Sequence, residues 1–166
     1  MFLTARHIQG CLNIVADRLS RSGPISTEWT LDPAGCRAIR SLQPEPQIDL
    51  FATHENTVLG SFVLHVEHPR AWGVDAFSLD WSIWDRIYLF PPVSLISKVL
   101  VKIRLFEGVA YLVTPHWPRR VWFVKIQNKA LSMVPLKSKI WQATPQGKVH
   151  APSCLQNLVL WTLCLP

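Results

Sequence analysis

Thirteen prolines divide the chain of 166 residues into short segments. A proline inside a helix removes a hydrogen bond and clashes with the preceding turn, so this spacing excludes a bundle of long helices. Hydrophobic residues make up 49% of the chain and charged residues 17%, a balance too apolar for a disordered protein. The length favours one compact domain with extensions. No stretch of about 18 apolar residues is free of charge, so the sequence predicts no membrane span and no membrane partner.

Strand-like and helix-like segments alternate in the middle of the chain. The sequence predicts strands over 47–53, 61–66, 86–90 and 108–115, and helices over 93–106 and 117–131. The helical spacing of Ile96, Val99 and Ile103 supports the first of these helices. Such alternation favours an α/β fold in which helices flank a small parallel or mostly parallel sheet.

We expect irregular extensions at both ends of this domain. Asn13 can cap a short helix over 14–20, and Pro24 prevents its continuation. Residues 23–46 are rich in proline and polar residues, which predicts a linker with one helical turn near 34–41. Residues 132–166 are interrupted by prolines, and their last apolar piece, 155–163, has no visible partner strand.

Positive charge is concentrated in the second half of the chain. Residues 1–85 carry six Lys/Arg against ten Asp/Glu, a net charge of −4, whereas residues 86–166 carry eleven Lys/Arg against Glu107 alone, a net charge of +10. A basic half can attract nucleic acid through counterion release. The alternative is an ordinary solvated basic surface.

The basic residues fall on the two predicted helices. If those helices share one face of the sheet, they form a single stripe flanked by Trp117 and Trp122. The stripe comprises Lys98, Lys102, Arg104, Arg119, Arg120, Lys125 and Lys129. Arginines interleaved with aromatic rings can neutralise phosphates and stack on bases, which predicts non-specific binding of DNA or RNA. Alternatively, the two tryptophans seal the edge of the sheet.

Cysteines and histidines lack the spacing of metal ligands. Neither the four cysteines nor the six histidines form a pair at the intervals typical of zinc sites, so we expect no metal and no disulfide framework. A reducing compartment, nuclear or cytoplasmic, is then the expected location. The opening residues reach Arg6 too early for a secretory signal, so we expect an intracellular protein that is not secreted.

Residues 5–21 read Ala-Arg-His-Ile-Gln-Gly-Cys-Leu-Asn-Ile-Val-Ala-Asp-Arg-Leu-Ser-Arg. This stretch resembles the end of the ribonuclease H domain of retroelement polyproteins, where a proline stands in place of Gln9. The resemblance implies that Asp17 matches the last of four metal-binding carboxylates and that His7 matches a residue beside that site. Two-metal chemistry needs the whole carboxylate cluster, and the other three members should precede Met1. We therefore expect residues 1–22 to be a relic without ribonuclease H activity.

Three further motifs occur in order over residues 48–93. They are Ile48-Asp49-Leu50-Phe51-Ala52-Thr53 with Asn56 behind it, Asp75-Ala76-Phe77-Ser78-Leu79-Asp80-Trp81, and Phe90-Pro91-Pro92-Val93. They resemble the methyltransferase-like domain that follows ribonuclease H in DIRS-type, tyrosine-recombinase retroelements, which is similar to Dam-type adenine methyltransferases. The resemblance implies a reduced Rossmann-like sheet over residues 47–131. It also implies vestigial contacts to S-adenosylmethionine from Asp49, Phe51, Asn56, Asp75 and Phe77, with both aspartates at the same sheet edge.

The third motif departs from the family at the two positions that carry catalysis. In the family, an Asn-Pro-Pro-Tyr turn receives a flipped adenine; here Phe90 replaces the asparagine and Val93 replaces the tyrosine, and only Pro91 and Pro92 remain. We therefore expect no bound cofactor and no methyl transfer. The alternative is an S-adenosylmethionine-dependent adenine DNA methyltransferase with a degenerate motif. If the resemblance is set aside, Asp49 is an acidic residue in a loop and Asp75 caps a short helix. Pro91 and Pro92 then only end the preceding strand.

Together these observations predict a non-enzymatic fragment of a retrotransposon polyprotein, with weak affinity for nucleic acid as its only activity. The expected segments are a ribonuclease H relic over 1–22, a linker over 23–46, an α/β domain over 47–131 and a tail over 132–166. The resemblance also implies a recombinase after this domain, and we expect the chain to stop before it, since a catalytic Arg, His and Tyr set of that kind is not recognised in the sequence.

Overall fold

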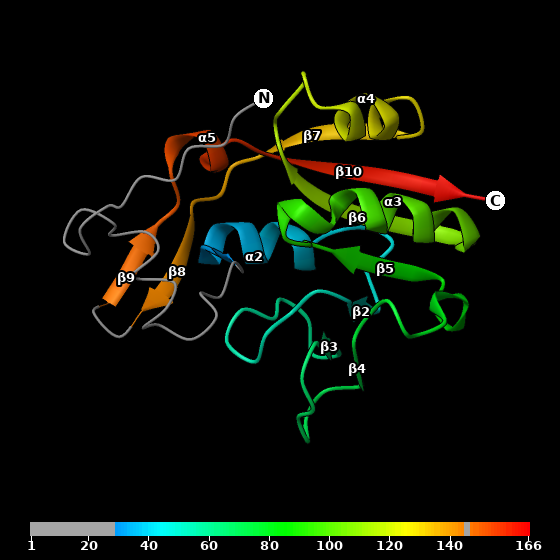
Figure 1. Ribbon diagram of the computed structural model, residues 1–166, viewed down its shortest axis with the longest axis horizontal. Helices are drawn as coiled ribbons and strands as arrows, with labels where there is room; N and C mark the ends of the chain where they lie inside the picture. The colour runs from blue at the N-terminus through cyan, green and yellow to red at the C-terminus, as the bar shows by residue number, and fades with distance from the viewer. Residues whose placement is uncertain (1–28, 145–146) are drawn as a thin grey trace, which may run out of the picture.

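The computed structural model describes residues 29–144 and 147–166, which form a mixed α/β structure (Figure 1). His7, Asp17 and the helix predicted over 14–20 lie outside the described residues. None of the helices in the described ranges combines the length and the hydropathy that a membrane span requires.

A mixed five-stranded sheet forms the centre of the structure. Its strands, in spatial order, are β2 (Ile48–Asp49), β5 (Arg86–Leu89), β6 (Gly108–Pro115), β10 (Leu158–Leu165) and β7 (Ser132–Leu136). The first three strands are parallel, whereas β10 runs antiparallel to both of its neighbours. The expectation of a parallel or mostly parallel sheet is therefore right for β2, β5 and β6 and wrong for the half of the sheet that β10 and β7 form.

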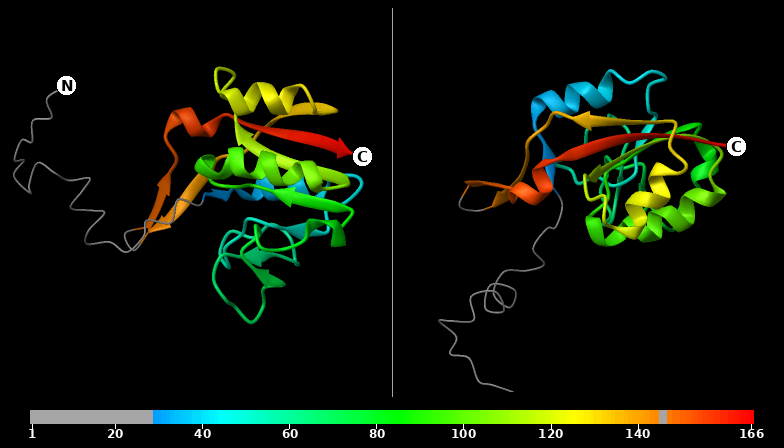
Figure 2. Two further views of the ribbon diagram at one scale, coloured as in Figure 1. Left: turned by 45° about the vertical axis from the view of Figure 1, so that its right-hand side comes forward. Right: turned by 90° about the horizontal axis from the view of Figure 1, so that it is seen from above.

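Helices cover both faces of this sheet. The view from above in Figure 2 shows α2 (Pro33–Arg40) on one face, with α3 (Ile96–Lys102) and α4 (Val121–Gln127) on the other. Short 3₁₀ turns over Val93–Leu95 and Ile103–Leu105 extend α3 at its two ends.

The remaining elements are small and lie around this sheet. Two further sheets join β1 (Thr30–Leu31), β8 (Ile140–Thr144) and β9 (Gly147–His150), and β3 (Val63–Leu64) with β4 (Gly73–Val74). A 3₁₀ turn over Trp81–Ile83 precedes β5, and α5 (Ser153–Gln156) precedes β10.

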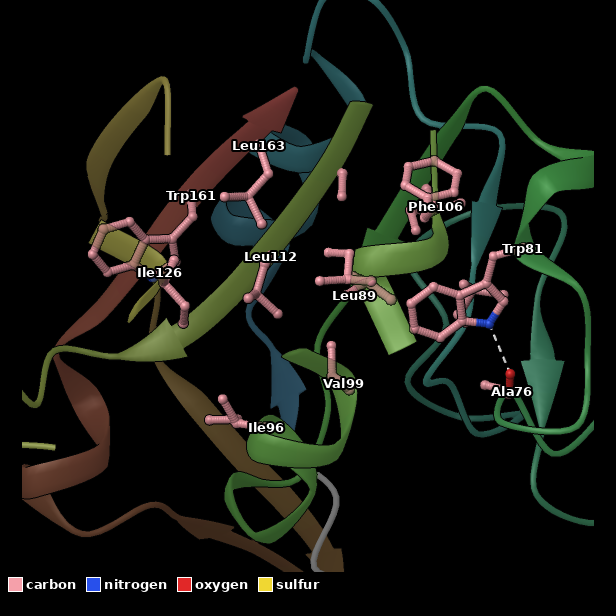
Figure 3. Packing of buried hydrophobic residues seen from close by; sticks show 14 of the residues in the cluster. Ala76, Trp81, Leu89, Ile96, Val99, Phe106, Leu112, Ile126, Trp161 and Leu163 are labelled. Atoms are coloured by element: carbon pink, nitrogen blue, oxygen red, sulfur yellow. Dashed lines mark hydrogen bonds between the residues drawn. The ribbon is translucent and has the colours of Figure 1, made fainter. Parts of the chain in front are cut away.

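Alternation along β6 divides the core into two layers. Ala110 and Leu112 face the cluster under α3 and α4, whereas Tyr111 and Val113 face the cluster under α2. This is the period of two that a strand buried on both faces requires. Figure 3 shows the layer under α3 and α4, in which Leu112 and Trp161 lie among side chains from both helices.

The C-terminal segment is the largest correction to the sequence analysis. Residues 158–165 are not an irregular tail: they form β10, which pairs with β6 along its full length and with β7 on its other side. A long apolar run with few polar interruptions is typical of a strand buried between neighbours. Its partner strand β6 ends more than forty residues earlier, so local patterns did not reveal the pairing.

The segment predicted as a linker over 23–46 also contains a structural element. The helical turn expected near 34–41 is α2, whose Ile39 is completely buried against the sheet. Asp32 caps α2 by accepting a hydrogen bond from the Gly35 amide (2.8 Å), and it also accepts one from the Ser138 hydroxyl (2.9 Å). Desolvation opposes ionisation of Asp32, but these hydrogen bonds outweigh it and lower the pKa of its carboxyl group.

Candidate functional site

A small pocket lies beyond the carboxyl ends of the parallel strands β2 and β5. It has a volume of about 80 Å³, and its walls include Phe51, Asp75, Phe77 and Pro92. These four residues come from all three motifs of the sequence analysis. The structure therefore brings together one part of the site that the resemblance implied, at the sheet edge where α/β folds bind ligands.

Protein groups already occupy the surroundings of Phe77 in this pocket. The Phe51 ring meets it edge-on, with the ring centroids 5.4 Å apart. The ammonium group of Lys98 on α3 lies 4.0 Å from the centroid of the Phe77 ring, a cation–π contact. A flat ligand that stacked on the face of Phe77 occupied by Lys98 would have to displace the ammonium group.

Asp75 lines the pocket but forms a local turn. Its backbone φ is 52°, in the left-handed region, and its carboxylate accepts a hydrogen bond from the Phe77 amide at 3.0 Å. Aspartate tolerates this conformation because its short side chain can bond to nearby backbone. Asp75 therefore stabilises a turn, and no helix begins there as the helix-cap alternative required.

Asp49, the last residue of β2, is not among the residues that line this pocket. Along β2, Ile48 and Leu50 belong to the layer under α3 and α4, so strand alternation turns Asp49 toward the layer under α2. Its side chain is 2% exposed and accepts a hydrogen bond from the Val58 amide at 3.1 Å. Burial raises the pKa of the neighbouring Tyr88 phenol, and the Asp49 carboxylate raises it further.

Asn56 likewise has a structural role in the loop after β2. Its side-chain oxygen accepts a hydrogen bond from the Thr53 amide, and its side-chain nitrogen donates to the Trp29 carbonyl at 3.5 Å. Asn56 and Asp49 therefore both hold the 50–58 loop in place.

The Phe90-Pro91-Pro92-Val93 turn is covered by other parts of the chain. The space beside it measures about 20 Å³ and is closed by Trp29, Ile140 and Leu158. That volume is close to what one water molecule needs and is much smaller than a nucleobase. The turn ends β5, as the strand-stop alternative proposed.

The seven basic residues do not form one stripe. Lys102 donates hydrogen bonds to the carbonyls of Phe77 (2.8 Å) and Leu79 (2.7 Å), and Lys98 contacts the Phe77 ring. Both lysines therefore fix the 77–81 segment on one side of α3. Arg104 lies in the next 3₁₀ turn and, with Lys125 and Lys129, lines a separate pocket. The sequence analysis placed Lys98, Lys102 and Arg104 on one face of the helix, whereas Lys98 and Lys102 contact the 77–81 segment and Arg104 lines the pocket.

The loop between β6 and α4 presents cations beside an aromatic ring. Trp117 is partly exposed; its indole N–H donates to the Cys154 carbonyl at 2.8 Å, and the Arg120 guanidinium lies 5.5 Å from its ring centroid. Arg119 and Arg120 are exposed. Trp122 is only 8% exposed and packs in the core, so it cannot stack on a base. Trp122 therefore packs in the interior under α4, as the alternative without a binding role requires.

A larger pocket between α3, α4 and β10 was missed by the sequence analysis. It has a volume of about 210 Å³, and Arg104, Lys125 and Lys129 contribute to its walls. The basic residues themselves were identified. The pocket was not, because Leu163 and Leu165 of β10 form part of it and that segment was expected to be an irregular tail.

Neither a metal-ligand cluster nor a known relative defines the site. Among the described residues, no group of three or more His, Cys, Asp or Glu side chains could hold a metal ion. Comparisons with protein-family models, with curated proteins and with solved structures gave no match.

Proposed function

We propose that this chain is a methyltransferase-like module from a DIRS-type retroelement polyprotein, and that it binds DNA or RNA without sequence preference and without catalysis. Support for the origin comes from the three motifs and from the pocket that joins Phe51, Asp75, Phe77 and Pro92. Three parallel strands with helices on both faces are compatible with a reduced Rossmann-like domain.

The exposed pair Arg119 and Arg120 carries the binding proposal. The pair follows the carboxyl end of β6, beside the partly exposed ring of Trp117. Neither arginine has an ion-pair partner among the residues that the structure describes. From residue 86 onward the chain holds eleven basic residues and one acidic residue, so the half of the chain that carries the pair is strongly positive. Phosphates are the natural counterions of such a surface.

Binding to duplex and single-stranded DNA of random sequence tests this proposal. We expect a dissociation constant of about 10⁻⁴–10⁻⁶ M at physiological salt, the range of non-specific binding. In fluorescence-anisotropy titrations at several salt concentrations, Arg119→Ala/Arg120→Ala should reduce the slope of log K against log salt by roughly 1.8 on duplex DNA, because each phosphate contact contributes about 0.9.

The matched control is Arg37→Ala/Arg70→Ala, which removes the same charge from the acidic half. Both of these arginines are exposed, and the control should leave the slope of the parent chain unchanged. Equal slopes for the two double variants would show that only net charge matters. An affinity that does not change with salt would remove the proposal.

The geometry favours binding without methyl transfer. Drug-sized ligands occupy pockets of roughly 300–1,000 Å³, whereas the pocket at Phe77 measures about 80 Å³ and the space at Pro91 about 20 Å³. The residues present therefore do not fit S-adenosylmethionine together with a flipped adenine. Phe90 also lacks a hydrogen-bond acceptor in its side chain for the adenine amine.

A thermal-shift assay separates this proposal from the methyltransferase alternative. Millimolar S-adenosylmethionine should leave the Tm of the chain unchanged, because the pockets are too small to bind it. A ligand that did bind, at 100 times its Kd, would stabilise the fold by about 2.7 kcal/mol. For a domain of this size that stabilisation corresponds to a shift of several degrees. A saturable rise in Tm, together with transfer of a labelled methyl group to duplex DNA, would establish the alternative instead.

A further inference from the structure

The pocket between α3, α4 and β10 has an aliphatic floor. Leu100 and Ile103 come from the α3 side, Ile126 from α4, and Leu163 and Leu165 from β10. Figure 3 shows Ile126 and Leu163 in the same layer of side chains. An apolar cavity of about 150 Å³ can hold a benzene molecule, so a pocket of about 210 Å³ has room for a short hydrocarbon chain.

Cations and an amide complete the walls of this pocket. Arg104, Lys125 and Lys129 line it together with Asn128, and no acidic residue is among the lining residues. None of the three cations has a hydrogen-bond or ion-pair partner within residues 29–144 and 147–166. Three positive groups around one opening, without a protein counterion, create a site that favours an anion.

The chemistry of the walls distinguishes between classes of anion. Nucleobases bind where aromatic side chains stack on them, and no aromatic residue lines this pocket. Inorganic phosphate would use the cations but leave the aliphatic floor exposed to water. An aliphatic chain that ends in a carboxylate satisfies both parts, since the chain covers the leucine and isoleucine side chains and the carboxylate meets the ammonium and guanidinium groups.

We propose that this pocket binds a medium-chain fatty carboxylate. Its hydrocarbon chain lies on the aliphatic floor, which includes Leu100 and Leu163, and its carboxylate lies beside Lys125 and Lys129. This site is separate from the nucleic-acid surface of the proposed function. Arg119 and Arg120, which carry that function, do not line the pocket.

Calorimetric titration of the full chain with octanoate tests the proposal, with hexanoate and octylammonium as comparison ligands. Octanoate should bind with a Kd of about 1 mM or tighter. Hexanoate should bind roughly 15-fold more weakly, because it lacks two methylenes and each buried methylene contributes about fourfold. Octylammonium carries the same chain with the opposite charge and should not bind. Equal affinity for octanoate and octylammonium would overturn the proposal, as would equal affinity for octanoate and hexanoate.

Two double variants identify the cations that meet the carboxylate. Lys125→Gln/Lys129→Gln should weaken octanoate binding about tenfold, because two exposed ion pairs with the carboxylate are lost and each contributes a few-fold. Lys137→Gln/Lys139→Gln removes the same charge from exposed positions outside the pocket and should leave binding unchanged. Equal losses in both variants would show that octanoate responds to net charge, which would overturn the site.

Two further measurements separate the pocket from other surfaces. Arg119→Ala/Arg120→Ala should bind octanoate like the parent chain even if nucleic-acid binding fails. Failure of the nucleic-acid proposal can therefore be distinguished from failure of the carboxylate site. Vesicles of anionic lipid should not displace octanoate from the protein when the lipid concentration matches that of the protein. Competition by such vesicles would reassign the cations to a lipid surface and overturn the small-molecule proposal.

Discussion

Replacing Trp161 by alanine is expected to lower the free energy of unfolding by about 3–5 kcal/mol, as for large aromatic residues in other cores. Trp161 is completely buried in β10, and its ring meets Phe123 of α4 edge-on at a centroid distance of 4.9 Å. Its indole N–H donates to the Thr114 hydroxyl at 2.9 Å, inside the same layer. The variant leaves a cavity and a hydroxyl without its donor. Guanidinium unfolding followed by far-UV circular dichroism measures the loss.

Met133→Ala is the control for this prediction. Met133 pairs with Trp161 in the register of β7 and β10, but it is 40% exposed on the outermost strand. Its truncation should cost far less than that of Trp161, at most about 1 kcal/mol by comparison with surface substitutions. Similar losses for the two variants would contradict the central position of β10.

The sequence predicted the elements that have strong local patterns. Strand β6 has the predicted bounds 108–115, β5 lies within 86–90, and α3 with its 3₁₀ turns lies within 93–106. In each case proline or glycine marks a boundary, and the apolar spacing is unambiguous. The second predicted helix, 117–131, is shorter than expected, because α4 begins only at Val121. The turn around Pro118 occupies its predicted start.

Long-range pairing explains what the sequence analysis missed in the fold. β10 cannot be recognised without β6 and β7, because a continuous apolar run fits a buried strand and a buried helix equally well. The same omission hid the larger pocket, whose floor includes Leu163. By contrast, the orientation of Asp49 was accessible from the sequence. Ile48 and Leu50 on either side of it had to face one layer, so Asp49 had to face the other.

Gly108→Ala is expected to destabilise the fold by more than the roughly 1–3 kcal/mol that a glycine-only backbone conformation costs by itself. Gly108 has a φ of +137° at the first residue of β6, a conformation that L side chains rarely adopt. An added Cβ would also overlap the Asp85 carbonyl oxygen and approach the Phe106 ring. That carbonyl accepts a hydrogen bond from the Val109 amide at 2.8 Å, so relieving the overlap disturbs the start of the β5–β6 pair. Thermal and guanidinium unfolding measure the loss of stability.

Gly60→Ala provides the opposite case within the same chain. An added Cβ at Gly60 meets no atom within 4 Å, and this exposed residue is not among the glycines with positive φ. Alanine there reduces the freedom of the unfolded chain, so it should be neutral or stabilise the fold by up to about 1 kcal/mol. The two substitutions add the same methyl group, so the difference between them isolates the backbone conformation and the Asp85 contact. If Gly108→Ala were as stable as Gly60→Ala, the turn that leads from α3 into β6 would have to differ from the one described.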